Sequence, residues 1–318
     1  MFTLNRMAAL LAAFLLVSPG FALHAEPPVA QKPALPLTVP ADPQEAETVA
    51  TASAHPALWK IADEDTTIWL FGTVHILPAG IDWFNGPVAA AFDSADTLVT
   101  EIVDPGPGKM AAIIANKAMR PAGTNLRDTF APIELAAYEG ALGDLGAPVT
   151  MFDAYKPWYA AVGISTLPLM REGFATENGV ERTLVARAVA KGMPQKGLET
   201  PEAQIGLFDA LPETVQRRYL ANVLEQLPGI REELKAMIEA WKAGNAEELA
   251  RMMNEDESDP ELIEALLLGR NRAWAEWLAD RLEQPGTVFV AVGAGHLAGS
   301  GSVQEQLARA EIETERVQ

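Results

Sequence analysis

Short apolar runs bounded by turn residues alternate with longer segments of helical periodicity along most of this chain. The runs are rich in β-branched and aromatic residues, which is typical of strands. They lie at 58–61, 67–71, 97–103, 149–152, 193–198 and 287–292. The acidic segment Asp63-Glu64-Asp65 separates the first two runs and predicts a hairpin between them.

Helices are predicted between these runs, at 87–94, 132–145, 157–170 and 180–191, with a last one at 303–310. From 201 to 282 the pattern is almost wholly helical, with apolar positions recurring at helical spacing, as at Leu234, Met237, Ile238 and Trp241. Strands that alternate with helices favour an α/β fold. We therefore expect an α/β protein with a helical insertion before the final strand.

Five of the predicted strands end in a polar residue able to bind a metal or transfer a proton: His75, Glu101, Asp153, Glu199 and His296. Ligands of open α/β sheets bind outside the carboxyl ends of the strands. A single acid there is more often a helix cap or a solvated residue. Two histidines together with acids at this edge indicate a functional site.

Two of these strands lead into the same short motif, Gly72-Thr73-Val74-His75 and Gly293-Ala294-Gly295-His296. Either copy alone would favour a structural histidine. The chain, however, contains 4 His, and the other two, His24 and His55, lie outside the expected folded body. The body's histidines thus share one context, which predicts that both imidazoles belong to one site.

Glu101 belongs to an apolar face of its predicted strand, between Val99 and Val103. An ionised carboxylate in such a place is unfavourable unless it is paired or bound to a metal. The alternative is an exposed position at the edge of the sheet.

The chain contains no Cys, so any metal must be held by histidine and carboxylate. We expect His75 and His296 to be metal ligands and Glu101 to be a third ligand or the general base. These donors suit manganese, cobalt, iron or zinc, and the sequence does not choose among them. Glu199, Asp153 and Arg270 are further candidates for orienting a histidine or stabilising an oxyanion.

The first residues resemble a secretory signal: Arg6, an apolar run over 7–17, and small residues at Ala22 and Ala25. We expect a signal peptide at 1–25, a disordered Pro- and Ala-rich linker at 26–54 and one α/β domain at 55–318. This organisation predicts a periplasmic or secreted protein without stable membrane insertion after cleavage; a retained anchor is the alternative. The formal net charge of -19 argues against nucleic acid as a partner.

Common hydrolase and cofactor motifs are absent. The chain has neither His-Glu-x-x-His nor Gly-x-Ser-x-Gly. The spacing of Gly293, Gly295 and Ala298 satisfies a loose dinucleotide-binding pattern, but no second strand–helix unit follows it. We treat that match as accidental.

Taken together, these motifs resemble the TraB/GumN family, which is related to the Tiki-type metalloproteases. The resemblance extends from about Leu58 to the end and rests on the two Gly-x-x-His motifs, Glu101 and several further segments. These are Leu58-Trp59-Lys60-Ile61, Lys156-Pro157-Trp158, Gly197-Leu198-Glu199-Thr200 and Arg270-Asn271 with Trp274. Where the family commonly has Gly-Val-Asp, this chain has Gly179-Val180-Glu181.

The resemblance implies an α/β fold with a mixed sheet built from two related halves, each contributing one Gly-x-x-His. It also implies a divalent-metal-dependent hydrolase, proteolytic in the Tiki branch, and hence a peptide or protein substrate. Two alternatives remain open. One is a periplasmic haem- or metal-binding protein without turnover, and the other is an inactive interaction protein whose histidines close the sheet.

Overall fold

The computed structural model describes residues 52–172, 174–255 and 259–318. The expected signal peptide lies outside the described residues, as does most of the expected linker. The end of that linker belongs to the fold, because β1 (Ala52–Ser53) pairs with β4 (Ile81–Asp82) and Ala54 is fully buried. Within the described ranges, no helix is both long enough and apolar enough to cross a bilayer.

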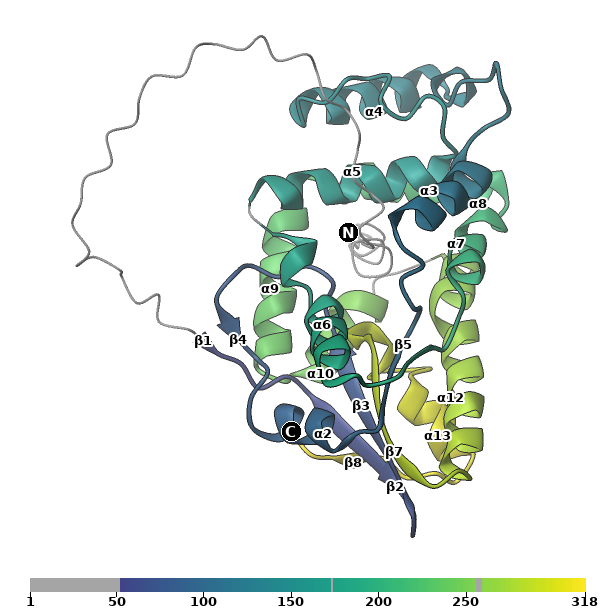
Figure 1. Ribbon diagram of the computed structural model, residues 1–318. Coiled ribbons are helices and arrows are strands. Elements are labelled where there is room, and N and C mark those ends of the chain that lie inside the picture. Colours follow the sequence, from purple (N-terminus) through teal and green to yellow (C-terminus); the bar gives the residue numbers. More distant parts are fainter. Residues whose placement is uncertain (1–51, 173, 256–258) are drawn as a thin grey trace, which may run out of the picture.

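A six-stranded mixed sheet forms the centre of the fold, in the order β6-β5-β7-β3-β2-β8 (Figure 1). The first four strands in this order are parallel to one another. β2 pairs antiparallel with β3, and β8 pairs antiparallel with β2. The predicted mixed α/β class and the first hairpin, β2 with β3, are confirmed. The strands are β2 (Leu58–Ala62), β3 (Thr66–Thr73), β5 (Thr97–Thr100), β6 (Gln195–Gly197), β7 (Gly286–Gly293) and β8 (Glu315–Arg316).

Alternate residues of β3 and β7 contribute to two separate cores, because successive side chains of a strand point to opposite faces. Phe71 and Phe289 pack with α2 (Gly86–Ser94) and α6 (Val180–Lys191). Leu70 and Val290 pack on the other face with α12 (Gly269–Leu282) and α13 (Val303–Arg309). Burial on both faces explains why these strands are apolar throughout.

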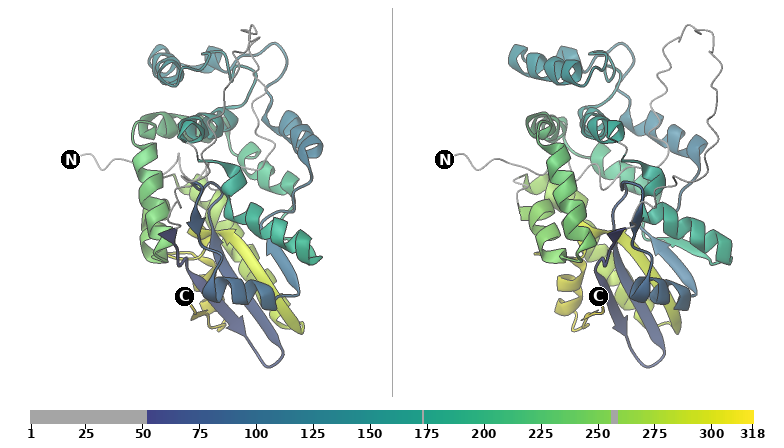
Figure 2. Two further views of the ribbon diagram at one scale, coloured as in Figure 1. Left: turned by 60° about the vertical axis from the view of Figure 1, so that its left-hand side comes forward. Right: turned by 90° about the vertical axis from the view of Figure 1, so that its left-hand side faces the viewer.

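The helical insertion covers the carboxyl ends of the parallel strands, with α4, α5 and α8 stacked beyond them (Figures 1 and 2). It includes the predicted helices as α4 (Pro132–Asp144) and α5 (Pro157–Arg171). Its other helices are α3 (Pro107–Ala118), α7 (Pro201–Asp209), α8 (Glu213–Gln226), α9 (Ile230–Lys242), α10 (Ala246–Ala250) and α11 (Pro260–Ile263). The strand ends at which the sequence predicts a functional site therefore lie between the sheet and this helical layer.

The strand predicted at 149–152 does not form. These residues make a turn between α4 and α5, in which the Met151 N–H donates to the Pro148 carbonyl (2.9 Å). The run is apolar because Phe152 is buried among the helices of the insertion, against Tyr155 and Tyr159. The helix α3 was not predicted.

Candidate functional site

The two Gly-x-x-His motifs lie side by side because β3 and β7 are neighbouring parallel strands, with Thr73 opposite Gly293. The second motif turns into a short 3₁₀-helix, η6 (Ala294–His296). A Cβ atom added to Gly72 would lie 3.1 Å from the Cα of Ala294, so glycine permits the close approach of the two turns. The indole N–H of Trp241 donates to the Gly72 carbonyl (2.8 Å) and holds the first turn in place.

Glu101 directly follows β5 and connects that strand to the second motif. Its Oε1 accepts a hydrogen bond from the Gly293 N–H (2.8 Å), and a Cβ atom on Gly293 would lie 3.2 Å from this oxygen. Glu101 is 5% exposed, which rules out the alternative of an exposed edge position. The backbone N–H of Glu199 donates to the Glu101 carbonyl (2.8 Å), so the ends of β5 and β6 bring the two acids together.

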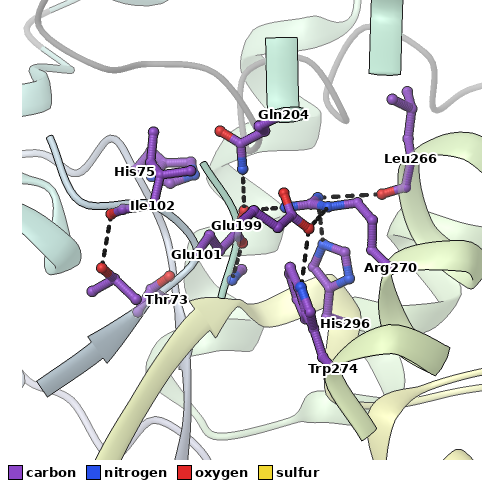
Figure 3. Close-up of polar contacts among 12 residues, drawn as sticks. Thr73, His75, Glu101, Ile102, Glu199, Gln204, Leu266, Arg270, Trp274 and His296 are labelled. Atoms are coloured by element: carbon purple, nitrogen blue, oxygen red, sulfur yellow. Dashed lines mark hydrogen bonds and ion pairs between the residues drawn. The ribbon is translucent and has the colours of Figure 1, made fainter. Parts of the chain in front are cut away.

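Arg270 forms the centre of the site, from the first turn of α12 (Figure 3). Its Nη2 donates to Glu101 Oε2 (2.5 Å), and its Nε donates to Glu199 Oε1 (2.8 Å). Its Nη1 lies 3.1 Å from His296 Nε2. The structure thus brings Glu101, Glu199, Arg270 and His296, all singled out from the sequence, into one buried network.

His296 is a neutral imidazole in a fixed orientation. Because a guanidinium can only donate, Nε2 must accept from Arg270, and the proton therefore resides on Nδ1, which donates to Asn271 Oδ1 (2.6 Å). Burial, together with the positive charge of Arg270, lowers the pKa of His296 to about 3. Its ring also packs against Trp274, with centroids 4.4 Å apart.

His75 is held differently. Its Nδ1 lies 3.0 Å from Glu181 Oε1, on the first turn of α6, and the Thr73 hydroxyl donates to the same carboxylate. Its Nε2 is buried and has no hydrogen-bond partner among the described residues. Burial lowers the pKa of His75, but the negative charges of Glu181 and Glu101 outweigh this and leave it above 6.5.

The carboxylates of Glu101 and Glu199 differ in acidity. Burial raises the pKa of Glu101, but the charges of Arg270 and the two histidines outweigh it and leave the pKa at about 2. Burial raises the pKa of Glu199 above 4.5, although Arg270 opposes this. Glu199 is also the more accessible of the two, with 15% of its side chain exposed.

The expected metal ligands meet at this site, but their donor atoms are not all free. Figure 3 shows Glu101 between His75 and the pair Arg270–His296. Arg270 occupies His296 Nε2 and Glu101 Oε2, while His75 Nε2 and Glu181 Oε2 have no partner among the described residues. Among residues 52–172, 174–255 and 259–318, no three His, Cys, Asp or Glu side chains are grouped closely enough to hold a metal ion. The ligand set therefore stays a prediction.

Asp153 does not belong to the site. Its carboxylate accepts two hydrogen bonds from Arg127, at 2.7 and 2.8 Å, within the helical insertion. Its proposed role was wrong because it rested on a strand at 149–152, which does not form.

Several residues of the site were not assigned a role from the sequence. Gln204, on α7, donates from Nε2 to Glu101 Oε2 (2.8 Å), and no sequence signal marks it. Asn271 and Trp274 stood out only as family matches; they orient His296 and Glu199, since the Trp274 indole donates to Glu199 Oε1 (2.9 Å). Glu181 stood out only as a departure from the family pattern.

Most of the chain matches a known protein family. The family model described as "TraB/PrgY/gumN family" matches residues 57–316. The chain belongs to this family. The match extends over both Gly-x-x-His motifs and every other residue named in the site.

The relatives within the TraB/PrgY/gumN family that this chain matches carry no assigned activity. An uncharacterised protein of Treponema pallidum is 21% identical over 270 residues, which cover 77% of this chain and 78% of the relative. The uncharacterised protein YbaP of Escherichia coli is 27% identical over 169 residues, covering 52% of this chain and 61% of YbaP. No solved structure matches the chain.

Proposed function

We propose that this TraB/PrgY/gumN protein is a divalent-metal-dependent hydrolase that cleaves peptide bonds, with His75, Glu101 and His296 as metal ligands. One observation carries the proposal. Two imidazoles flank one ionised carboxylate, each with Nδ1 fixed by another side chain. Nε2 of His75 has no partner among the described residues, and Nε2 of His296 faces Arg270. Histidine ligands of metals are held in this way by their second ring nitrogen.

The charges of the site also fit a divalent cation. The site holds three carboxylates and one guanidinium: Arg270 contacts Glu101 and Glu199, and Glu181 pairs with His75. His296 is neutral. His75 Nε2 and Glu181 Oε2 are buried polar atoms without a partner in the described chain, which is unfavourable until something binds them. A cation at His75 Nε2 would satisfy that atom and offset part of the negative charge of the site.

Glu101 suits the role of ligand better than that of base. Its pKa of about 2 means that it is ionised but far too weak a base for proton transfer near neutral pH. Glu199 is the better candidate for general base, since burial raises its pKa and part of its side chain reaches solvent.

The chain's own residues would then divide the work of hydrolysis. A metal held by these ligands would supply Lewis-acid polarisation of the scissile carbonyl. Glu181 and Asn271 orient the two histidines, Glu199 takes a proton from the attacking water, and Arg270 stabilises negative charge on the substrate. Peptide as the substrate class rests on the resemblance to the Tiki-type metalloproteases.

The geometry favours this function over haem binding. An axial haem ligand needs an open imidazole edge, whereas His296 is 2% exposed, packs against Trp274 and directs its Nε2 at Arg270. A metal ion at His296 would have to displace Arg270, whereas a haem would have to displace the Trp274 ring as well.

The proposal is tested by metal content and by turnover. Purified protein is loaded with Mn²⁺, Co²⁺ or Zn²⁺, dialysed and analysed for metal, and a peptide library is cleaved with and without chelator. We expect His75→Ala and His296→Ala to lose most bound metal and all cleavage, because each removes one of three ligands. His55→Ala removes an exposed imidazole and is the matched control. Equal metal content in all three variants would refute the ligand assignment.

A further inference from the structure

Arg270 occupies the positions that a metal at this site would need. Its guanidinium contacts His296 Nε2 and Glu101 Oε2, the donor atoms of two of the three proposed ligands. It also contacts both carboxylate oxygens of Glu199, at 2.8 and 3.3 Å, and the Leu266 carbonyl at 3.3 Å. The guanidinium is thus the resident cation of a buried cluster of acids.

We propose that Arg270 is an internal competitor of the metal. In the metal-free protein its guanidinium closes the site, and metal binding requires it to release His296 and Glu101. This inference rests on the proposed function, but it predicts a separate quantity, the sign of the change in metal affinity when Arg270 is loosened.

A resident cation has a physical reason to be there. The buried carboxylate of Glu101 and the half-buried one of Glu199 would repel each other and lack compensation without a positive charge between them. The planar guanidinium offers several donors in a fixed fork, so it can bridge both acids and an imidazole at once. A single ammonium group cannot contact all three in the same way.

Two further contacts help to hold Arg270 in this closed position. Glu199 holds its Nε, and its guanidinium carbon lies 4.5 Å from the Trp274 ring centre, in a cation–π contact. Both contacts are independent of Glu101 and His296. The preceding segment, η5 (Glu264–Leu268), is a π-helix, a form that occurs mostly as local bulges and frequently at functional sites.

Competition for donor atoms can be distinguished from simple electrostatics. If only charge matters, Glu199→Gln removes a negative charge and weakens cation binding, and Arg270→Lys changes nothing. If Arg270 competes, Glu199→Gln loosens the guanidinium and strengthens metal binding. Arg270→Lys then strengthens it too, because lysine keeps the charge but cannot bridge His296 and both acids.

The experiment is titration calorimetry with Mn²⁺ and with Co²⁺ on the purified protein and these two variants. Glu202→Gln, an exposed change three residues from Glu199, is the matched control. Thermal unfolding checks that each variant is folded, and Glu199→Gln is sufficient by itself if Arg270→Lys does not fold. We expect metal dissociation constants at least about tenfold lower in both test variants, the equivalent of one charge-assisted hydrogen bond.

The possible outcomes are distinct. Tighter binding in Glu199→Gln, or binding in the variants but not in the wild type, supports the competitor role. Wild-type binding with equal or weaker binding in Glu199→Gln overturns this role and leaves the proposed function standing. No binding in any of the proteins overturns both.

Discussion

Replacing Glu101 with glutamine should destabilise the metal-free protein strongly, because every partner of this carboxylate is a donor. Gly293 N–H, Gln204 Nε2 and Arg270 Nη2 all donate to it. Glutamine keeps one oxygen but turns the other acceptor into an NH₂ group, which must then face a donor. The substitution also removes one of the two carboxylates that neutralise the buried Arg270.

The pKa of Glu101 gives the magnitude. A value of about 2 in the fold, against 4.5 for an unperturbed carboxyl, corresponds to about 3 kcal/mol at about 1.4 kcal/mol per pH unit. Breaking a buried ion pair generally costs about 3–5 kcal/mol, which agrees. Since domains of this kind have a free energy of unfolding of about 5–15 kcal/mol, Glu101→Gln should fold but be much less stable.

The effect should depend on pH in a defined direction. The folded-state pKa of Glu101 is depressed, so its contribution is complete above pH 4.5 and is lost as the pH falls from there towards 2. At pH 3.5 the stability difference between wild type and Glu101→Gln should be smaller than at pH 7, by roughly 1 kcal/mol. The assay is urea unfolding of chelator-treated protein at both pH values, followed by tryptophan fluorescence.

The control is Glu276→Gln, an exposed carboxylate on α12, which should change stability by no more than about 0.5 kcal/mol. A difference below about 1 kcal/mol for Glu101→Gln at pH 7, or one that does not shrink at pH 3.5, would show that Arg270 does not depend on this carboxylate. The assignment of Arg270 as the centre of the site would then be wrong.

Two further predictions concern His75 and the N-terminus. Glu181→Gln should bring the pKa of His75 in the metal-free protein below 6.5, because burial then acts without its main opposing charge. NMR titration of the imidazole measures this pKa. An unchanged value would contradict the pairing of His75 with Glu181. The apolar run at 7–17 predicts export with cleavage after Ala22 or Ala25. N-terminal sequencing of periplasmic protein checks it, and an intact Met1 there would disprove cleavage.

Much of the fold could be predicted because local pattern and tertiary environment agree. The strands at 67–71 and 287–292 are apolar at every position after their first threonine, and each is buried on both faces of the sheet. The run at 149–152 looks equally apolar, but Phe152 is buried by helices rather than by strands. A four-residue run does not distinguish these two environments.

Some residues of the candidate site could likewise be predicted from the sequence, and others could not. His75, Glu101, Glu199 and His296 could be found because each follows a strand, and the ends of parallel strands meet at one edge. Gln204 could not, because it reaches Glu101 from a helix of the insertion, across more than a hundred residues of sequence. The protonation state of each histidine could not be predicted from the sequence either, since it depends on whether Arg270 or Glu181 is the neighbour.

The contacts of Glu101 connect three parts of the chain that are far apart in sequence. Through Gly293, Gln204 and Arg270, one carboxylate joins the sheet, the helical insertion and the helix that follows it. Insertion and sheet should consequently unfold as one cooperative unit rather than as two. A substitution at Glu101 should therefore change the stability of the sheet and of the insertion together, even when it is made to alter the site alone.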